Sequence, residues 1–372
     1  MTSTELGGSV VLTVGEGRTR IPIRNLWLLY LYASEFYEHL EREERVRAED
    51  QADALLELAA RILCTEADLA LRRSLNVGYV ERHQDLGAVR GRIDHLGTAR
   101  GWYLQRGRVL CRFDEISVDT PRNRYIAAAL AYAGRRLGNS TIDPGIGASC
   151  LSTASRFEHA GVQLAAPDVT TPRREVYGHY DRRDRRPMAA ARFVLEDLLP
   201  SHSAGPHAII ASKHTHHSLR QLYEKAMRNF YRVNLPECSV GSRVLSWPGM
   251  AALDPVFPRM KTDITIDRPD GTRLVIDTKF TSALSADSHY FGPRLKSHHL
   301  YQLYAYLRTQ VDRGDAAADT ARGMLLYPAT NEAPDLDVVA TMHGHTVRVA
   351  TVDLAMEPSG IRHRLLELTE HN

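Results

Sequence analysis

The sequence predicts a protein of α/β and α+β class with two domains, a mixed α+β domain over residues 1–199 followed by an α/β domain over residues 200–372. A chain of 372 residues can bury two hydrophobic cores. The small, polar, proline-flanked stretch at residues 200–208 is typical of a linker. After it the pattern changes to strand, helix, hairpin and helix, an order that indicates helices around a central sheet.

The first domain combines helical segments with one β-rich segment. Residues 77–95 are punctuated by glycine and have the character of short strands and turns. Other segments show apolar residues at helical spacing or a high content of helix-forming residues, and a capping aspartate, Asp119, precedes one of them. The predicted helices are residues 21–40, 51–75, 119–138 and 188–200.

Composition excludes several classes of protein. A content of 43% hydrophobic and 25% charged residues is that of an ordinary globular chain, which excludes disordered and fibrous proteins. No apolar run approaches the length of about 18 residues that a membrane span needs. The N-terminus lacks the pattern of a signal peptide. The four cysteines are scattered without a CxxC pair, so we expect reduced thiols in a cytoplasmic protein that does not contact a membrane.

The net charge of +2 does not indicate a strong global attraction to nucleic acid. Arginine is nevertheless concentrated at residues 173–187 and 106–112. A solvated loop is the more usual explanation for such a stretch, and a patch that contacts phosphates is the alternative.

Histidines also cluster in two places, at His214, His216 and His217 and at His298 and His299. A zinc site needs ligands that converge from set spacings, and no cysteine or carboxylate pattern accompanies these residues. We therefore expect exposed or helix-capping histidines.

The stretch RPDGTRLVIDTKF, residues 268–280, places an aspartate and a lysine two positions apart at the end of an apolar strand. The turn signal that opens it puts Gly271 where a positive φ is favourable. Side chains at i and i+2 of a strand share a face, so Asp277 and Lys279 project together. For these two residues alone, an ordinary surface pair on a hairpin is the simplest interpretation, and loss of either charge should leave folding intact.

Asp263 opens the preceding strand, and a hairpin can bring it beside Asp277. Two carboxylates held that close repel each other unless a cation lies between them. Oxygen ligands select a hard ion, and Mg²⁺ is the usual one for phosphate chemistry, with Mn²⁺ as the alternative. Lys279 would supply a positive charge for the attacking hydroxide and for the phosphorus in the transition state.

Three further residues extend this pattern. Glu224 lies on the helix before the hairpin, and Gln302 and Tyr306 lie at i and i+4 on the helix after it, where they share one face. The order of helix Glu, Asp, Asp-x-Lys and Gln-x-x-x-Tyr is the order of the PD-(D/E)xK nuclease fold in its RecB-like branch.

Several motifs together resemble the McrC family, the nuclease subunits of McrBC modification-dependent restriction systems. Asp119 and Asn123 belong to one of them. The resemblance covers nearly the whole chain from about residue 21. The motifs are IPIRNLWLLYLYA (21–33), GAVRGRIDHLGTARG (87–101), CRFDEISVDTPRNRYI (111–126), PRMKTDITI (258–266), LVIDTKF (274–280), LYQLYAYL (300–307) and GMLLYP (323–328).

The resemblance implies an N-terminal domain that docks on McrB, a hexameric AAA+ GTPase, and a C-terminal PD-(D/E)xK, restriction-endonuclease-like domain. The motor reads modified cytosine in double-stranded DNA, and the McrC subunit cuts. The chain has no G-x-x-x-x-G-K-[ST] loop, so it should bind no nucleotide itself. The implied catalytic residues are Asp263, Asp277, Lys279, Glu224 and Gln302.

The resemblance also implies metal ligation by Asp263, Asp277 and the backbone carbonyl of Thr278. The chain departs from the family where about twenty residues precede the usual start, and where Thr278 replaces a frequent alanine. Two other functions stay open, a stand-alone nuclease of another defence or repair system and a motor activator that does not cut. Retention of the two aspartates and Lys279 argues against the activator.

Overall fold

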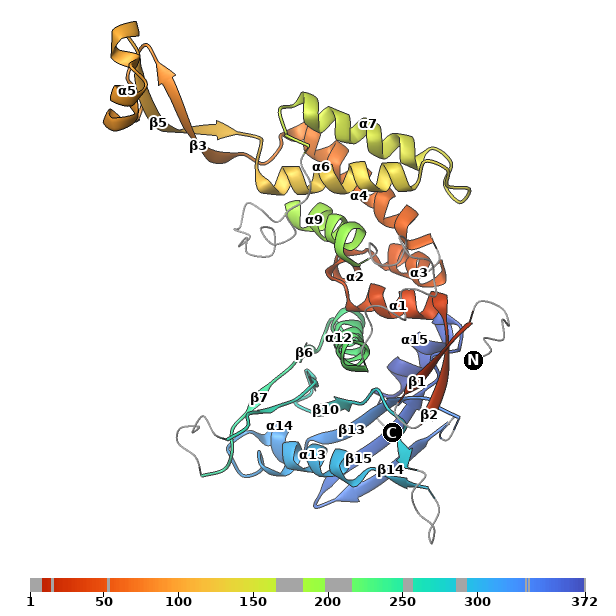
Figure 1. Ribbon diagram of the computed structural model, residues 1–372. Coiled ribbons are helices and arrows are strands. Elements are labelled where there is room, and N and C mark those ends of the chain that lie inside the picture. Colours follow the sequence, from red (N-terminus) through yellow and green to blue (C-terminus); the bar gives the residue numbers. More distant parts are fainter. Residues whose placement is uncertain are drawn as a thin grey trace. The chain divides into compact units, whose positions relative to one another are not determined.

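The computed structural model divides into two compact units (Figure 1). One unit comprises Met1–Asp53 with Pro200–Asn372, and the other is Ala54–Leu199. We call them the sheet unit and the helical unit. One division falls at the predicted boundary between residues 199 and 200, but residues 1–53 belong to the sheet unit rather than to a continuous N-terminal domain. The structure describes residues 9–14, 17–51, 54–164, 183–197, 216–249, 257–285, 293–331, 333 and 335–370.

Residues 1–53 join the sheet unit because helix α1 (Ile23–Ala33) packs against helix α12 (His216–Asn234). Buried Asn229 of α12 donates hydrogen bonds from Nδ2 to the carbonyl oxygens of Tyr32 and Ser34, at 2.7 and 2.9 Å. The rings of Tyr32 and Phe230 lie 5.0 Å apart between centroids. These contacts join residues about two hundred positions apart, a separation that no local sequence pattern reveals.

Replacing Asn229 with alanine should destabilise the sheet unit. The variant leaves two buried carbonyl oxygens without donors, which should lower the free energy of unfolding by about 2–4 kcal/mol. Urea denaturation measures the loss. Exposed Lys225 on the same helix provides the control variant, Lys225→Ala. A loss no larger than that of the control would contradict this role for Asn229.

The sheet unit is built on one six-stranded mixed sheet in the order β14-β15-β13-β10-β9-β6, which confirms the predicted α/β character. Strands β10, β13 and β15 run parallel, while β9 is antiparallel to β10, β6 to β9, and β14 to β15. The strands are β6 (Ser239–Gly241), β9 (Ile264–Asp267), β10 (Arg273–Thr278), β13 (Arg322–Pro328), β14 (Asp337–Met342) and β15 (His345–Val352).

Shorter elements complete this unit. The described part of this unit also contains three two-stranded sheets and five further helices, and α12 contacts both β6 and β10. They are β1 (Ser9–Val14) with β2 (Gly17–Pro22), β7 (Val244–Leu245) with β8 (Met260–Lys261), β11 (Leu284–Ser285) with β12 (Arg294–Leu295), α2 (Glu35–His39) with α3 (Arg42–Asp50), and the helices α13 (Ser297–Arg308), α14 (Ala316–Asp319) and α15 (Pro358–Glu367).

Helix α13 packs closely on the centre of the sheet. Its Leu303 and Leu307 share a buried cluster with Val275 of β10 and Leu325 of β13. A Cβ atom at Gly323 would lie 2.8 Å from Cδ1 of Leu307, so this close approach requires glycine. Because side chains alternate along a strand, the face of β10 that carries Val275 is the face that α13 covers.

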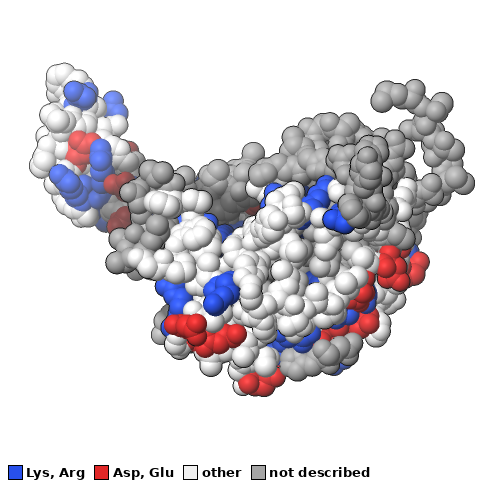
Figure 2. Space-filling model, turned by 90° about the horizontal axis from the view of Figure 1, so that it is seen from below, with Lys and Arg blue, Asp and Glu red and all other residues white. Residues whose placement is uncertain are grey.

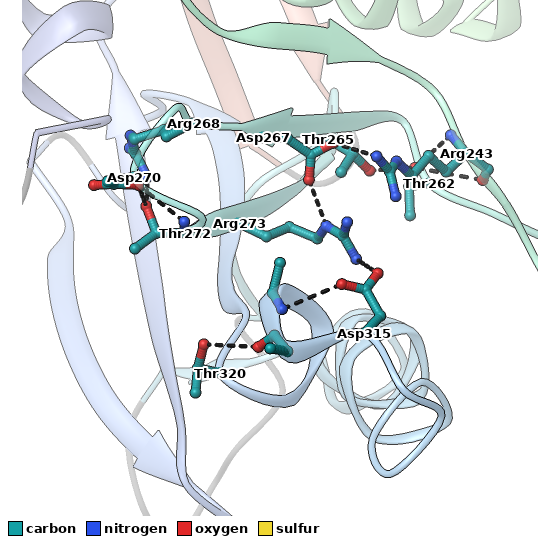
Figure 3. A network of polar contacts seen from close by, with 12 residues as sticks. Arg243, Thr262, Thr265, Asp267, Arg268, Asp270, Thr272, Arg273, Asp315 and Thr320 are labelled. Carbon is teal, nitrogen blue, oxygen red and sulfur yellow. Dashed lines mark hydrogen bonds and ion pairs between the residues drawn. The ribbon is translucent and has the colours of Figure 1, made fainter.

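The β9–β10 hairpin forms as its turn residues predict. Gly271 has a φ of +82°, as expected, and its N–H donates to the carbonyl oxygen of Arg268 at 3.0 Å. The Asp270 carboxylate accepts hydrogen bonds from the backbone and the hydroxyl of Thr272, at 2.9 and 2.7 Å (Figure 3). The turn therefore closes the hairpin at the end remote from Asp277.

A polar network fixes the register of this hairpin (Figure 3). Arg273 of β10 donates to Asp267 of β9 and to Asp315 ahead of α14, each at 2.6 Å. Asp267 also pairs with Arg243, and Asp315 accepts a hydrogen bond from the backbone N–H of Ala317 at the start of α14. A slip of one residue would move every β10 side chain to the opposite face, so this network helps to decide where Asp277 points.

The helical unit packs four helices around its core and carries a three-stranded sheet in the order β3-β5-β4. Its elements are α4 (Leu55–Arg73), β3 (Gly78–Leu86), β4 (Arg92–Ile93), α5 (His95–Arg100), η2 (Tyr103–Arg106), β5 (Val109–Ser117), α6 (Pro121–Arg136), α7 (Ile146–His159), α9 (Arg185–Arg192) and η4 (Phe193–Asp197). The helices predicted over residues 51–75 and 119–138 and the strands within 77–95 are confirmed.

Two predicted helices differ from the structure, and one further prediction is not tested. The helix expected over residues 21–40 is divided at Ser34, whose side chain caps α2. The helix expected over 188–200 begins at Arg185 as α9 and continues as η4 to Asp197. The linker predicted at residues 200–208 lies outside the described residues.

The residues of the motif around Asp119 form hydrogen bonds at the junction between β5 and α6. Thr120, not Asp119, caps α6, with its hydroxyl accepting from the N–H of Asn123. The Asp119 carboxylate instead binds Arg124 through two hydrogen bonds, at 2.7 and 2.5 Å. Asn123 donates to the carbonyl oxygen of Val118 at 2.7 Å. These residues therefore hold the chain where it passes from strand to helix.

The arginines near β5 lie among carboxylates. Arg108 pairs with Asp85 at 2.5 Å and Arg82 with Glu115 at 3.2 Å. Positive and negative side chains are accordingly interspersed over the part at the left of Figure 2. Residues 165–182 lie outside the described chain, so most of the arginine-rich stretch at 173–187 is outside it too.

All four cysteines are free thiols, as expected, with the sulfur atoms of Cys64 and Cys150 3.2 Å apart in the interior of the helical unit. Within the described ranges, none of the helices combines the length and the apolar character needed to cross a membrane.

Candidate active site

The hairpin brings Asp263 and Asp277 to the same end of the sheet. Ile264 of β9 pairs with Ile276 of β10, so the antiparallel register places Asp263 opposite Asp277. Oδ2 of Asp263 accepts two hydrogen bonds from Thr278, one from its N–H and one from its hydroxyl, both at 2.8 Å. The carboxylate of Asp263 is thereby held against the carboxyl end of β10.

Asp277 and Lys279 form a buried pair. Nζ of Lys279 lies 2.7 Å from Oδ2 of Asp277, and the two side chains are 4% and 0% exposed, respectively. The backbone N–H of Lys279 donates to the carbonyl oxygen of Leu326 at 2.9 Å, which continues the pairing of β10 with β13. The interpretation of a surface pair on an ordinary hairpin is therefore wrong.

Gln302 and Tyr306 extend this pair into α13. Oε1 of Gln302 accepts a hydrogen bond from Nζ of Lys279 at 2.9 Å. Nε2 of the same amide donates to the hydroxyl of Tyr306 at 2.6 Å. The ammonium group of Lys279 is therefore held by Asp277 of β10 and by Gln302 of α13 together.

Glu224 approaches from α12. Its carboxylate accepts a hydrogen bond from Nη1 of Arg228 at 2.8 Å, and the same nitrogen lies 3.1 Å from the carbonyl oxygen of Asp263. The negative charge of Glu224 contributes to a raised pKa at Asp263, after burial itself. The structure therefore brings Glu224 near Asp263, with its carboxylate held by Arg228.

Burial makes the two aspartates costly to ionise. It raises the pKa of Asp277 to about 6, against the opposing effect of Lys279 and with a further increase from the charge of Asp263. Oδ2 of Asp277 is paired with Nζ of Lys279, whereas Oδ1 is buried and has no hydrogen-bond partner among the described residues. Oδ1 is therefore available to another ligand. A cation between the carboxylates would compensate the cost of their burial.

The residues fit a magnesium ion chemically. Asp277 offers a buried Oδ1 without a hydrogen-bond partner among the described residues, and Asp263 offers a second carboxylate at the same strand end. Among the residues that the structure describes, no group of three or more His, Cys, Asp or Glu could hold a metal ion. Mg²⁺ usually keeps several waters and is held by one or two carboxylates, so Asp263 and Asp277 together would be enough protein ligands for it.

Two contacts near the candidate site were not predicted from the sequence. The hydroxyl of Thr278 donates a hydrogen bond to Asp263, whereas the sequence analysis assigned a role only to the backbone carbonyl of Thr278. His299 is buried, with Nδ1 2.9 Å from the hydroxyl of Tyr327, so the expectation of an exposed or capping histidine is wrong there. Burial, together with the positive charge of Lys279, lowers the pKa of His299 to about 3, which keeps the ring neutral.

The other histidines differ in how far they are described. His298 is exposed, as expected. His214 and the side chains of His216 and His217 lie outside the described part of the chain.

Replacing Thr278 with valine should weaken metal binding. Valine keeps the volume of this buried side chain but removes the hydroxyl that positions Asp263. Loss of such an orienting contact typically lowers metal affinity by about 10–100-fold. Titration calorimetry with Mg²⁺ measures the change, and Thr278→Ser, which keeps the hydroxyl, should bind like the wild type. Equal affinity of the valine and serine variants would show that the hydroxyl does not orient Asp263.

Comparison with known proteins gives one family match and several relatives. Residues 16–148 match the family described as McrBC 5-methylcytosine restriction system component. The chain is 24% identical over 360 residues to the type IV methyl-directed restriction enzyme EcoKMcrBC of Escherichia coli (strain K12), covering 94% of this chain and 97% of that protein.

Two solved assemblies from Thermococcus gammatolerans are also similar. One is a half-complex from a tetradecameric assembly of McrB AAA+ hexamers with bound McrC, at 15% identity and a TM-score of 0.42, covering 93% of this chain and 76% of that chain. The other is the McrBC complex, at 19% identity and a TM-score of 0.33, covering 46% of this chain and 50% of that chain. Both sequence matches are to components of McrBC restriction systems, and this chain is similar to them over residues 16–148 and over 94% of its length, respectively.

Proposed function

We propose that this protein is the DNA endonuclease subunit of a GTP-dependent restriction system that acts on DNA containing modified cytosine. The observation that carries the proposal is the buried cluster of Asp263, Asp277 and Lys279 at one strand end, with Gln302 holding the lysine. Burying three charged side chains together costs free energy. Clusters of buried ionisable side chains are therefore found preferentially at catalytic and binding sites. The arrangement agrees with a PD-(D/E)xK nuclease site.

The residues have distinct roles in this proposal. Asp263 and Asp277, with the backbone carbonyl of Thr278, would hold Mg²⁺ or Mn²⁺. When bound, the ion would supply Lewis-acid polarisation of the phosphate and of a water molecule. Lys279 presents its ammonium group where negative charge develops, and Gln302 fixes its direction. Glu224 holds Arg228 beside the backbone of Asp263.

The partner in this proposal is a hexameric McrB-like AAA+ GTPase. The similar Thermococcus assembly is named for McrB AAA+ hexamers with bound McrC, and the Escherichia coli relative is named as methyl-directed. The chain itself has no phosphate-binding loop of the G-x-x-x-x-G-K-[ST] type, so GTP would be bound and hydrolysed by the partner. The helical unit is proposed to dock on this motor and to stimulate it, in the cytoplasm.

A cleavage assay tests the function. Methylated and unmethylated plasmids are incubated with the protein in Mg²⁺, with and without GTP and the partner motor. The proposal expects cutting of the methylated plasmid only when all components are present. Efficient cutting by the chain alone would favour a stand-alone nuclease. Stimulated GTP hydrolysis without any cutting, in either metal, would instead identify a motor activator.

A further inference from the structure

Helix α12 directs a row of charged side chains towards the site. Arg220, Glu224 and Arg228 are spaced at i, i+4 and i+8, so they share one face of the helix. Arg228 contacts the carbonyl oxygen of Asp263, and Glu224 pairs with Arg228. Arg220 lies one helical turn further along the same face.

The position of α12 relative to β10 is fixed by an aromatic contact. Tyr223 is fully buried, and its ring centroid lies 5.4 Å from that of Phe280. Phe280 directly follows Lys279 in the chain. The turn of α12 that carries Arg220 therefore runs beside the end of β10 at which Asp277 and Lys279 are located.

The charge of Arg220 reaches groups on both sides of the site. It acts on the pKa of Asp277, which belongs to β10, and on the pKa values of His299 and Tyr306, which belong to α13. Arg220 therefore lies within electrostatic range of both elements. The side chain of Arg220 is exposed, so it can reach a ligand from solvent.

Arg220 differs from the other arginines of its helix in having no partner. Arg228 pairs with Glu224 and Arg232 with Glu38. For Arg220, the described residues provide neither an ion pair nor a hydrogen bond. A solvated surface arginine is the ordinary explanation for such a residue, but it does not account for a location from which its charge acts on the buried carboxylate of Asp277.

We propose that Arg220 binds a phosphate of the DNA backbone and positions the strand over Asp277 and Lys279. A guanidinium group binds phosphate oxygens through two parallel hydrogen bonds, which fixes orientation as well as distance. Arg220 is a positioning residue in this scheme. The inference rests on the proposed nuclease function and adds to it the group that holds the substrate.

The experiment compares Arg220→Gln and Arg220→Lys with Lys225→Gln, a loss of one positive charge at an exposed position of the same helix. Binding of the full chain to a short DNA duplex is measured with Ca²⁺ in place of Mg²⁺, over a series of salt concentrations. Single-turnover cutting of methylated plasmid is measured with the partner motor and GTP. The shift in melting temperature on addition of Mg²⁺ is recorded for each variant.

We expect Arg220→Gln to reduce the slope of log affinity against log salt by about one, because one phosphate contact is lost. Loss of a charge-assisted hydrogen bond should slow cutting by about 10–100-fold. Arg220→Lys should recover part of the rate, since lysine keeps the charge but not the paired geometry. The metal-induced shift should be unchanged in all variants, since Arg220 is not a metal ligand.

Arg220→Gln that cuts and binds DNA like Lys225→Gln would overturn the inference. So would a lower melting temperature with an unchanged salt slope, because the role would then be structural. If the isolated chain does not bind the duplex, the inference is tested instead by the ratio of the single-turnover cutting rates of Arg220→Gln and Lys225→Gln. Failure of the wild type to cut with motor, GTP and either metal would instead refute the proposed function, which separates the two failures.

Discussion

Replacing Asp277 with asparagine is expected to abolish DNA cutting by the complex of this chain with its motor. Asp277 offers a buried Oδ1 without a hydrogen-bond partner among the described residues, beside an Oδ2 paired with Lys279. Asparagine removes the negative charge and replaces one oxygen with an amide nitrogen that cannot bind a cation. Asp263 would remain as the only carboxylate at the strand end. Stimulation of GTP hydrolysis should persist, because the helical unit is unchanged.

Metal-induced stabilisation gives a second measurement on the same variant. Mg²⁺ that binds only the folded wild type raises its melting temperature by mass action, and Asp277→Asn should lose that increase. Asp270→Asn is the matched control, since Asp270 lies at the opposite end of the same hairpin. A metal-dependent shift that survives in Asp277→Asn would show that the ion binds elsewhere.

Replacing Lys279 with methionine should lower the cutting rate by about 10²–10³, the usual effect of removing one group that stabilises charge in a transition state. Methionine keeps most of the volume of this buried side chain while it removes the ammonium group. Lys261→Met, at an exposed position of β8, is the control. If Lys279→Met cuts at the wild-type rate, the pair with Asp277 is structural and the nuclease proposal fails.

The same variant should also be less stable, contrary to the sequence-based expectation that loss of either charge leaves folding intact. Removing one partner of a buried ion pair leaves the other uncompensated, which typically costs about 3–5 kcal/mol. Here the uncompensated group is Asp277, whose pKa burial already raises to about 6. Without Lys279 this pKa should rise further, because the interaction that lowers it is lost.

The sign of the pH dependence follows from this raised pKa. A carboxyl whose pKa is higher in the folded state than in the unfolded state costs stability when it is ionised, and this cost grows from the unfolded pKa to the folded pKa and is complete above it. A higher folded pKa in the variant therefore adds its extra cost only above the folded pKa of the wild type. The stability difference between Lys279→Met and the wild type should therefore be largest above neutral pH and shrink below about pH 6. Urea denaturation in the presence of a chelator, at several pH values, measures it. A difference that grows on acidification would contradict this account.

Local sequence patterns predicted much of the candidate site. The turn residues before β10 and the alternation of side chains along the strand were enough to place Asp277 and Lys279 on one face. In the structure, Nζ of Lys279 lies 2.7 Å from Oδ2 of Asp277. Helical spacing alone put Gln302 and Tyr306 on one face of α13, where they are hydrogen-bonded. Such inferences succeed because neighbouring residues in a regular element have fixed relative positions, whatever surrounds them.

The sequence by itself therefore determined the order of elements in both halves, the hairpin, and the set of chemical groups at its end. Only the tertiary structure decided that residues 1–53 pack on the sheet unit, that the pair of Asp277 and Lys279 is buried, and that Thr278 orients Asp263. The place of Arg220 beside the site was likewise decided by the packing of α12 on β10. The physical reason is the same for these four structural features. Each depends on contacts between segments distant in the chain, and burial and pairing arise only when those segments meet.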